Sequence, residues 1–327
     1  MPAPLPPPDV LFRILEVTVP VFGIVLISLA YARWRPVDMS AANRLNLVLF
    51  IPALIFHALA ERTEGELALG AAALGAAVIV LGSGLLAWPV ARALGWAPRT
   101  LAPPAMFNNS GNMGMPLAVL AFGEAALPMA VVLLVTTTVL QFTVGLIVLN
   151  GRLDIGALLR NPMLLATAAG LAAMALDWRI PALIEPGIAM LGDVAIPLML
   201  VALGVRLSEG GLGAWRIGLV GGLLTPLTGL AIALPWIAWT QPPDALADNL
   251  LLYAVLPPAV MNFMLAERFG QEPGSVASIV AIGNALSLLI VPVALWWTHS
   301  CRASEASHST ADTRCSRPAW RRHRPLP

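Results

Sequence analysis

The sequence is poor in charge and has no lysine. Charged residues make up 11% of its 327 residues, and the 19 basic residues are all arginine, whereas soluble domains carry about a quarter charged residues. The missing lysine excludes the phosphate-binding loop of ATP-driven pumps. The net charge of +1 gives no reason to expect nucleic acid as a partner. A soluble fold is therefore not expected.

Cysteine and catalytic motifs are also scarce. Cys301 and Cys315 both lie in the polar C-terminal segment, so neither a metal centre nor a buried redox pair is expected. His57 and Glu61 are not followed by the second histidine of a metalloprotease motif, and no Gly-x-Ser-x-Gly is present. We predict that the protein is not an enzyme and uses no cofactor.

Hydrophobic residues are abundant instead, at 58% of the chain with a mean hydropathy of +0.81. They form long blocks, and several exceed the roughly 20 residues that cross the hydrocarbon layer. We predict an all-α membrane protein with ten transmembrane helices in two inverted five-helix repeats. The predicted spans are 11–31, 43–60, 67–91, 101–122, 127–149, 162–176, 183–205, 214–239, 248–266 and 275–297.

Two of these spans have alternative interpretations. The block at 162–176 is short, so it either extends at its ends or forms a re-entrant pair with the next block. The first block resembles a secretory signal in length, but it carries Glu16 and runs into Arg33 and Arg35 without a basic start or a clear cleavage site. We expect it to be retained.

Arginines predict the orientation. The odd-numbered connections between spans hold most of them, and basic short loops stay cytoplasmic. The arginines of these connections are Arg33, Arg35, Arg44, Arg92, Arg99, Arg152, Arg160, Arg206, Arg216 and Arg268, against Arg62 and Arg179 in the even-numbered ones. We therefore expect a multi-pass protein of the inner (plasma) membrane with both termini on the non-cytoplasmic side.

The two halves of the chain contain similar sequence stretches at corresponding positions. The stretch 50–56, which contains an Ile-Pro pair, matches 195–201 at an offset of 145, and Phe122-Gly123 matches Phe269-Gly270 at an offset of 147. Because five is an odd number, the second half would begin on the opposite face of the membrane from the first. Such inverted repeats are an architecture of secondary transporters. The predicted organisation is a Pro-rich segment (1–10), a first repeat (11–149), a cytoplasmic connection (150–161), a second repeat (162–297) and a disordered Arg-rich tail (298–327).

The fourth span contains an unusual polar stretch at 108–116. Proline and glycine there predict a broken helix, which lipid tolerates only where the backbone lines a cavity or is buried in protein. Free N–H groups and amides at such a break suit a carboxylate, whereas the alternative is close helix packing. The substrate-binding candidates are Asn108, Asn109, Gly111 and Asn112, and the helix-break candidates are Gly114 and Pro116.

The ninth span has a corresponding stretch, with Pro257 and Pro258 followed by Asn262. Interrupted helices at matching positions of two halves indicate a transporter site. We predict that Pro257 and Asn262 contribute to substrate binding and that Pro258 breaks the helix.

Together these stretches resemble the auxin efflux carrier family, as a bacterial member related to the plant PIN-type auxin exporters. The resemblance covers nearly the whole chain up to about residue 297. The residues that carry it are Asn109-Ser110-Gly111 and Gly114-Met115-Pro116; Arg160-Asn161-Pro162 with Gly170; Ile196-Pro197 and Ala202-Leu203-Gly204; and Leu256-Pro257, Leu265-Ala266 and Phe269-Gly270.

The resemblance implies scaffold and transport bundles, crossed broken helices in the fourth and ninth spans, and export of organic anions by an elevator-like motion. It gives Asn109 the place of the substrate-contacting asparagine and Pro116 that of the first crossover proline. Asn262 stands where the plant exporters have the second crossover proline, and the long loop of many plant members is missing. Auxin itself is therefore not the expected substrate.

Ionisable residues inside the spans are candidates for ion coupling, because burying a charge there is costly. Asp193 lies about one turn before Pro197, and His57 can titrate near physiological pH. Glu16 is the third candidate. The alternatives are a structural hydrogen-bond hub for Asp193 and a satisfied core histidine for His57.

The predicted function is secondary transport of small organic anions such as carboxylates by alternating access, with protons or sodium as possible coupling ions. A homodimer follows from the resemblance alone, and membrane lipid surrounds the chain. The alternatives are a sodium-coupled symporter of the bile-acid type and a membrane-embedded enzyme or sensor.

Overall fold

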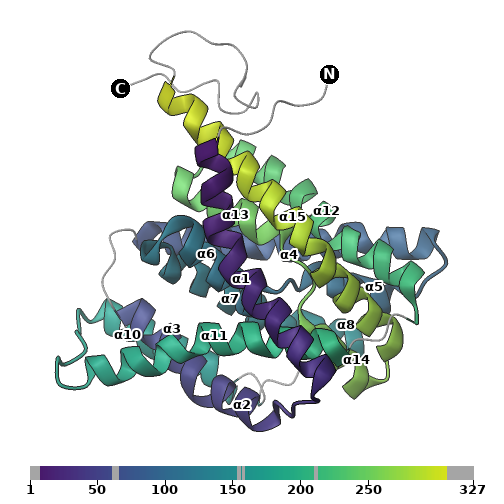
Figure 1. Cartoon of the computed structure of the whole chain (residues 1–327), viewed down its shortest axis with the longest axis horizontal. Coiled ribbons are helices and arrows are strands. Elements are labelled where there is room, and N and C mark those ends of the chain that lie inside the picture. Colours follow the sequence, from purple (N-terminus) through teal and green to yellow (C-terminus); the bar gives the residue numbers. More distant parts are fainter. Residues whose placement is uncertain (1–7, 61–65, 153–155, 157–158, 210–212, 308–327) are drawn as a thin grey trace.

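The computed structural model describes residues 8–60, 66–152, 156, 159–209 and 213–307, and this part of the chain is almost entirely helical (Figure 1). Apolar blocks form helices because a helix satisfies every internal backbone N–H and C=O within the segment, as lipid requires. The first half contains α1 (Pro8–Trp34), α2 (Ser40–Leu45), η1 (Asn46–Phe50), α3 (Ile51–Ala60), α4 (Glu66–Ala93), α5 (Pro98–Met106), η2 (Ser110–Gly114), α6 (Met115–Phe122), η3 (Glu124–Ala126), α7 (Leu127–Leu140), η4 (Gln141–Gly145) and α8 (Leu146–Asn150). The second half contains α10 (Pro162–Ala175), α11 (Glu185–Glu209), α12 (Trp215–Thr240), α13 (Asp244–Val255), α14 (Val260–Phe269) and α15 (Pro273–Ser307).

Seven helical stretches in the described residues are long and apolar enough to cross a membrane, and α10 is a shorter apolar helix. The predicted spans at 101–122 and 248–266 do not form single helices. Each is divided into two pieces, α5 before η2–α6 and α13 before α14. The protein is therefore a multi-pass membrane protein, and two of the ten predicted spans are interrupted.

The helices pack in two groups. In the first group, α1 lies along α11, and α3 packs against α10 and α11. In the second group, α12 packs against α15, α4 and α13. Helix α4 of this group also packs against α5 and α7. Contacts within each group are more extensive than those between the groups, which include α1 with α15 and α11 with η2. We call these groups the α1–α11 bundle and the α12–α15 bundle. The start of α1 and the end of α15 lie together at one end of the molecule (Figure 1).

Glycines allow close helix contacts within the α1–α11 bundle. A Cβ at Gly204 of α11 would lie 2.4 Å from the carbonyl oxygen of Val25 on α1. A Cβ at Gly170 of α10 would lie 2.8 Å from the Cβ of Leu59 on α3. Both glycines belong to the motifs of the family resemblance, and both have a packing role here.

The C-terminal helix differs from the sequence prediction. The segment 298–327 is predicted to be disordered, but α15 continues through Ser307. Residues 308–327 and residues 1–7 of the Pro-rich segment lie outside the described residues. The helix continues because residues 298–307 contain neither proline nor glycine, which are the residues that end helices most readily.

Candidate functional site

The two interrupted helices cross at their breaks. Residues 107–109, after α5, and residues 256–259, after α13, are not helical, and an isolated antiparallel bridge pairs Asn108 with Pro258. The backbone N–H of Asn109 donates to the Pro257 carbonyl at 2.7 Å, and that of Ala259 donates to the Phe107 carbonyl at 3.0 Å. Backbone groups released by both breaks therefore satisfy each other, which lowers the cost of opening helices inside the membrane.

Buried amide side chains hold this crossover in place. Nδ2 of Asn109 donates to Oδ1 of Asn284 on α15 at 3.1 Å, and Nδ2 of Asn284 donates to the Pro258 carbonyl at 3.0 Å. Nδ2 of Asn262 donates to the Phe107 carbonyl at 2.8 Å. Each asparagine is at most 3% exposed, so its side chain is shielded from solvent. These hydrogen bonds therefore attach the crossover to α15 and α14.

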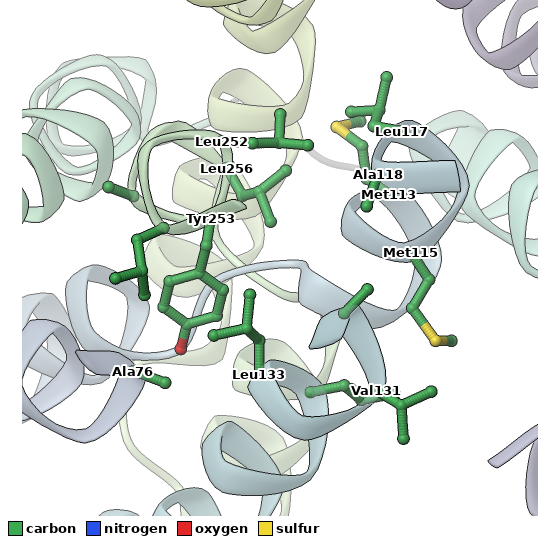
Figure 2. Packing of buried hydrophobic residues seen from close by; sticks show 14 of the residues in the cluster. Ala76, Met113, Met115, Leu117, Ala118, Val131, Leu133, Leu252, Tyr253 and Leu256 are labelled. Carbon is green, nitrogen blue, oxygen red and sulfur yellow. The ribbon is translucent and has the colours of Figure 1, made fainter. Parts of the chain in front are cut away.

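The hydroxyl of Tyr253 ties α13 to α7 just before the second break. Figure 2 shows the Tyr253 ring reaching between Ala76 of α4 and Leu133 of α7. Its hydroxyl hydrogen-bonds Oγ1 of Thr137, while its carbonyl oxygen accepts a bond from Nδ2 of Asn108 at 2.7 Å. This residue thereby connects the apolar core to the crossover.

A cavity of about 290 Å³ lies against the crossover, close to the size at which ligand pockets begin. Both bundles line it. The α1–α11 bundle contributes η1, α10 and α11, and the α12–α15 bundle contributes the segments around both breaks. We call it the amide cavity; its polar side chains are Asn43, Asn46, Asn108, Asn109, Ser110, Asn112, Thr137, Thr138, Gln141, Asn161 and Arg206.

Two helix N-termini face the amide cavity. Ser110, Gly111 and Asn112 begin η2, which continues into α6, and Val260 and Met261 begin α14. The first N–H groups of a helix have no partner within it, and they carry the positive end of the helix dipole. Both ends are directed at the same space, an arrangement that favours an anionic group.

Three π-helical segments, η1, η2 and η4, also line the amide cavity. Asn46 belongs to η1, Ser110 to η2 and Gln141 to η4. π-Helical turns are rare and are frequent at functional sites. Their wider turns place three polar side chains on the cavity wall, and Oδ1 of Asn46 is buried without a hydrogen-bond partner in the described residues.

The structure places the predicted substrate-binding residues in two groups. Asn108, Asn109, Gly111 and Asn112 line the amide cavity. Pro257 and Asn262 lie at the second break but are not among the lining residues. Asn262 reaches the cavity through Gln141, whose Nε2 donates to its Oδ1 at 3.3 Å.

The predicted break residues need a correction. Pro258 lies in the non-helical segment of the second break. The first break instead falls at residues 107–109, before Gly114 and Pro116, which lie in η2 and α6.

Sequence reasoning missed several cavity residues. Arg206, Asn43 and Asn161 lie at or near helix ends. In the sequence, Arg206 contributes only to the orientation and Asn161 only to the family resemblance, and nothing distinguishes Asn43. Oδ1 of Asn161 accepts a hydrogen bond from the N–H of Met163 at 3.0 Å and caps α10. Gln141 lines the cavity and connects α14 to it through its hydrogen bond to Asn262.

A second cavity, of about 480 Å³, lies between α1, α3, α6 and α11. Two predicted coupling residues, His57 and Asp193, line it together with Glu124 and Pro116, and we call it the acidic cavity. Nε2 of His57 lies 3.1 Å from Oε1 of Glu185. Glu16 is exposed on α1 and is not among the residues that line either cavity.

Comparison with known proteins supports the family resemblance. Residues 152–295 match the family model described as membrane transport protein, which is the domain of the auxin efflux carrier family. No curated protein matches the chain. The matched region begins just after α8 and ends within α15, and it includes α11, α13 and α14. This match and the long apolar helices support a membrane transporter rather than an enzyme.

Proposed function

We propose that this membrane transporter is a secondary carrier of small organic anions, with carboxylates as the main class. The observation that carries the proposal is the convergence of two helix N-termini and several amides on one cavity that both bundles line. A carboxylate there accepts hydrogen bonds from Asn109 and from the first N–H groups of η2 and α14. Apolar residues such as Met199, Met261 and Leu134 contact the rest of the molecule.

Movement of one bundle past the other would carry this site between the two sides of the membrane. The crossover belongs to the α12–α15 bundle, because its hydrogen bonds lead to α13, α14 and α15. The opposite wall of the amide cavity belongs to the α1–α11 bundle. Alternating access therefore needs only this interface to rearrange, in a ten-helix protein with inverted halves.

Uptake into proteoliposomes tests the proposal. Purified protein is reconstituted, and uptake of labelled pyruvate, succinate and benzoate is followed with and without imposed proton or sodium gradients. We expect saturable uptake of at least one carboxylate that Asn109→Ala reduces at least tenfold. Asn150→Ala is the control, because Asn150 is an exposed asparagine outside both cavities.

The gradients separate the coupling alternatives. We expect Asp193→Asn to remove stimulation by a proton gradient while uptake down the anion gradient persists. Stimulation by sodium alone would favour the symporter of the bile-acid type. If no carboxylate is taken up above protein-free liposomes, or if Asn109→Ala transports like Asn150→Ala, the proposed site is wrong.

A further inference from the structure

Several polar side chains that line the amide cavity are hydrogen-bonded within the protein. The hydroxyls of Thr137 and Thr138 each donate to the carbonyl four residues earlier, at 2.7 and 2.9 Å. Oδ1 of Asn161 accepts a hydrogen bond from the N–H of Met163 at 3.0 Å. These groups do not need a ligand to satisfy them.

Two amide oxygens of the lining residues lack such a partner. Oδ1 of Asn46, in η1, and Oδ1 of Asn108, at the first break, are buried and accept no hydrogen bond from the described residues. The two residues are 4% and 6% exposed, and they line the amide cavity from opposite bundles. A buried acceptor without a donor is costly and is rare in folded proteins. These oxygens therefore indicate that a ligand supplies the donor.

The side-chain amide of Asn108 is fixed in its orientation. Its Nδ2 donates to the Tyr253 carbonyl at 2.7 Å, so turning the amide over would bring two acceptor oxygens together. Asn108 is paired with the second break through its backbone, and Ser110 begins η2 two residues later. An unpaired acceptor is therefore held next to the helix N-terminus at which the proposed carboxylate binds.

A neutral donor suits these oxygens better than a cation does. No aspartate or glutamate is among the described residues that line the amide cavity. A cation there would have only dipoles to compensate its charge, and an uncompensated charge at membrane depth is costly. A hydroxyl group, by contrast, donates a hydrogen bond without adding a charge.

We propose that the substrate is a small hydroxy carboxylate, whose hydroxyl groups donate to Oδ1 of Asn46 and Oδ1 of Asn108. The inference rests on the proposed function, because the carboxylate of the same molecule binds at the N-termini of η2 and α14. A carboxylate without hydroxyl groups leaves both oxygens buried and unpaired, so it binds more weakly. Asn46 and Asn108 thus select among molecules whose carboxylates the helix N-termini bind equally well.

Saturable uptake of three labelled acids into proteoliposomes, measured above protein-free liposomes, tests this selectivity. Propionate, racemic lactate and racemic glycerate have the same carbon chain and one carboxylate, but they carry no hydroxyl group, one and two, respectively. The half-saturation concentration should fall from propionate to lactate and again to glycerate. The value for glycerate is expected to lie about tenfold or more below that for propionate, because each hydroxyl group satisfies a buried acceptor.

Asn46→Leu removes one of the two acceptors with little change in side-chain volume. It should narrow the difference between glycerate and propionate by about threefold or more, through a higher half-saturation concentration for glycerate. Asn43→Leu is the matched control, because Asn43 lines the same cavity about one turn earlier and has no buried unpaired oxygen in the described structure. The control should keep the wild-type ratio between the two acids.

Half-saturation concentrations of glycerate and propionate within about twofold of each other in the wild-type protein would overturn the inference. Equal ratios for Asn46→Leu and Asn43→Leu would also overturn it. Uptake that requires sodium and does not depend on the hydroxyl groups would assign the two oxygens to a cation instead. The wild-type series remains decisive if Asn46→Leu does not fold. Saturable uptake without a preference for hydroxyl groups leaves the proposed function intact, whereas uptake of no carboxylate at all overturns the proposed function and the inference with it.

Discussion

Gly283 is the position where a single methyl group should test the crossover most directly. A Cβ at Gly283 of α15 would lie 2.5 Å from Cδ and 2.8 Å from Cγ of Pro258, and 3.2 Å from the Cα of Gly222 on α12. Both neighbours are rigid, because one is a proline ring in the paired break and the other is helix backbone. The contact cannot be relieved by a rotamer change, so either the crossover or α15 must move.

The expected cost of Gly283→Ala is about 1–3 kcal/mol, the usual range for adding a methyl group to a packed core. We expect this variant to unfold several degrees below the wild type in a thermal unfolding experiment in detergent. Its carboxylate uptake should fall by more than the loss of folded protein explains, because Asn284, the next residue, positions Asn109.

Gly274→Ala is the matched control on the same helix. A Cβ at Gly274 meets no atom within 4 Å, and alanine favours helix over glycine by up to about 1 kcal/mol. The control should therefore unfold at the wild-type temperature or slightly above it. Equal unfolding temperatures and uptake for the two variants would refute the argument that Pro258 is held against α15.

Three further substitutions have defined expectations. Asn262→Ala leaves the Phe107 carbonyl with one hydrogen bond fewer and should lower the free energy of unfolding by about 1–3 kcal/mol; Asn262→Asp, tested beside it, should not restore stability, because a carboxylate cannot donate. Thr137→Val and Tyr253→Phe each remove the hydrogen bond between the hydroxyl groups of α7 and α13. A double-mutant cycle on the free energy of unfolding should therefore give a coupling energy of about 0.5–1.5 kcal/mol. Additive effects of the two substitutions would contradict the hydrogen bond. Gly204→Ala places a methyl group 2.4 Å from a carbonyl oxygen of α1; loss of folded protein is expected by size-exclusion chromatography, and a wild-type elution profile would contradict the close contact.

Local sequence properties predicted the long apolar helices and the interruption of two predicted spans. The length of an apolar stretch can be determined from consecutive residues alone, so the long helices were predictable without tertiary information. Pro257 and Pro258 break the helix through their own backbone chemistry, and the structure places the break at these residues. The polar stretch beginning at Asn108 was equally visible, because amides at membrane depth are rare.

Features that depend on packing were not predictable. The first break falls before Pro116 because Phe107 and Asn109 pair with the segment around Pro258, a contact about 150 residues away in sequence. Arg206 lines the amide cavity only because α11 packs beside η2. In the sequence it is one of many arginines at the end of a span, so nothing local distinguishes it.

The crossover also bears on how such a carrier can diversify. The crossover that lies against the amide cavity is held in part by paired backbone atoms of residues 107–109 and 257–259, which no side-chain replacement alters directly. The walls, by contrast, include Met199, Met261 and Met264, whose unbranched thioether side chains adapt to differently shaped neighbours. Mutations in the walls can thus change which molecules fit while the crossover persists, so that related sequences can acquire new substrates without rebuilding the paired breaks.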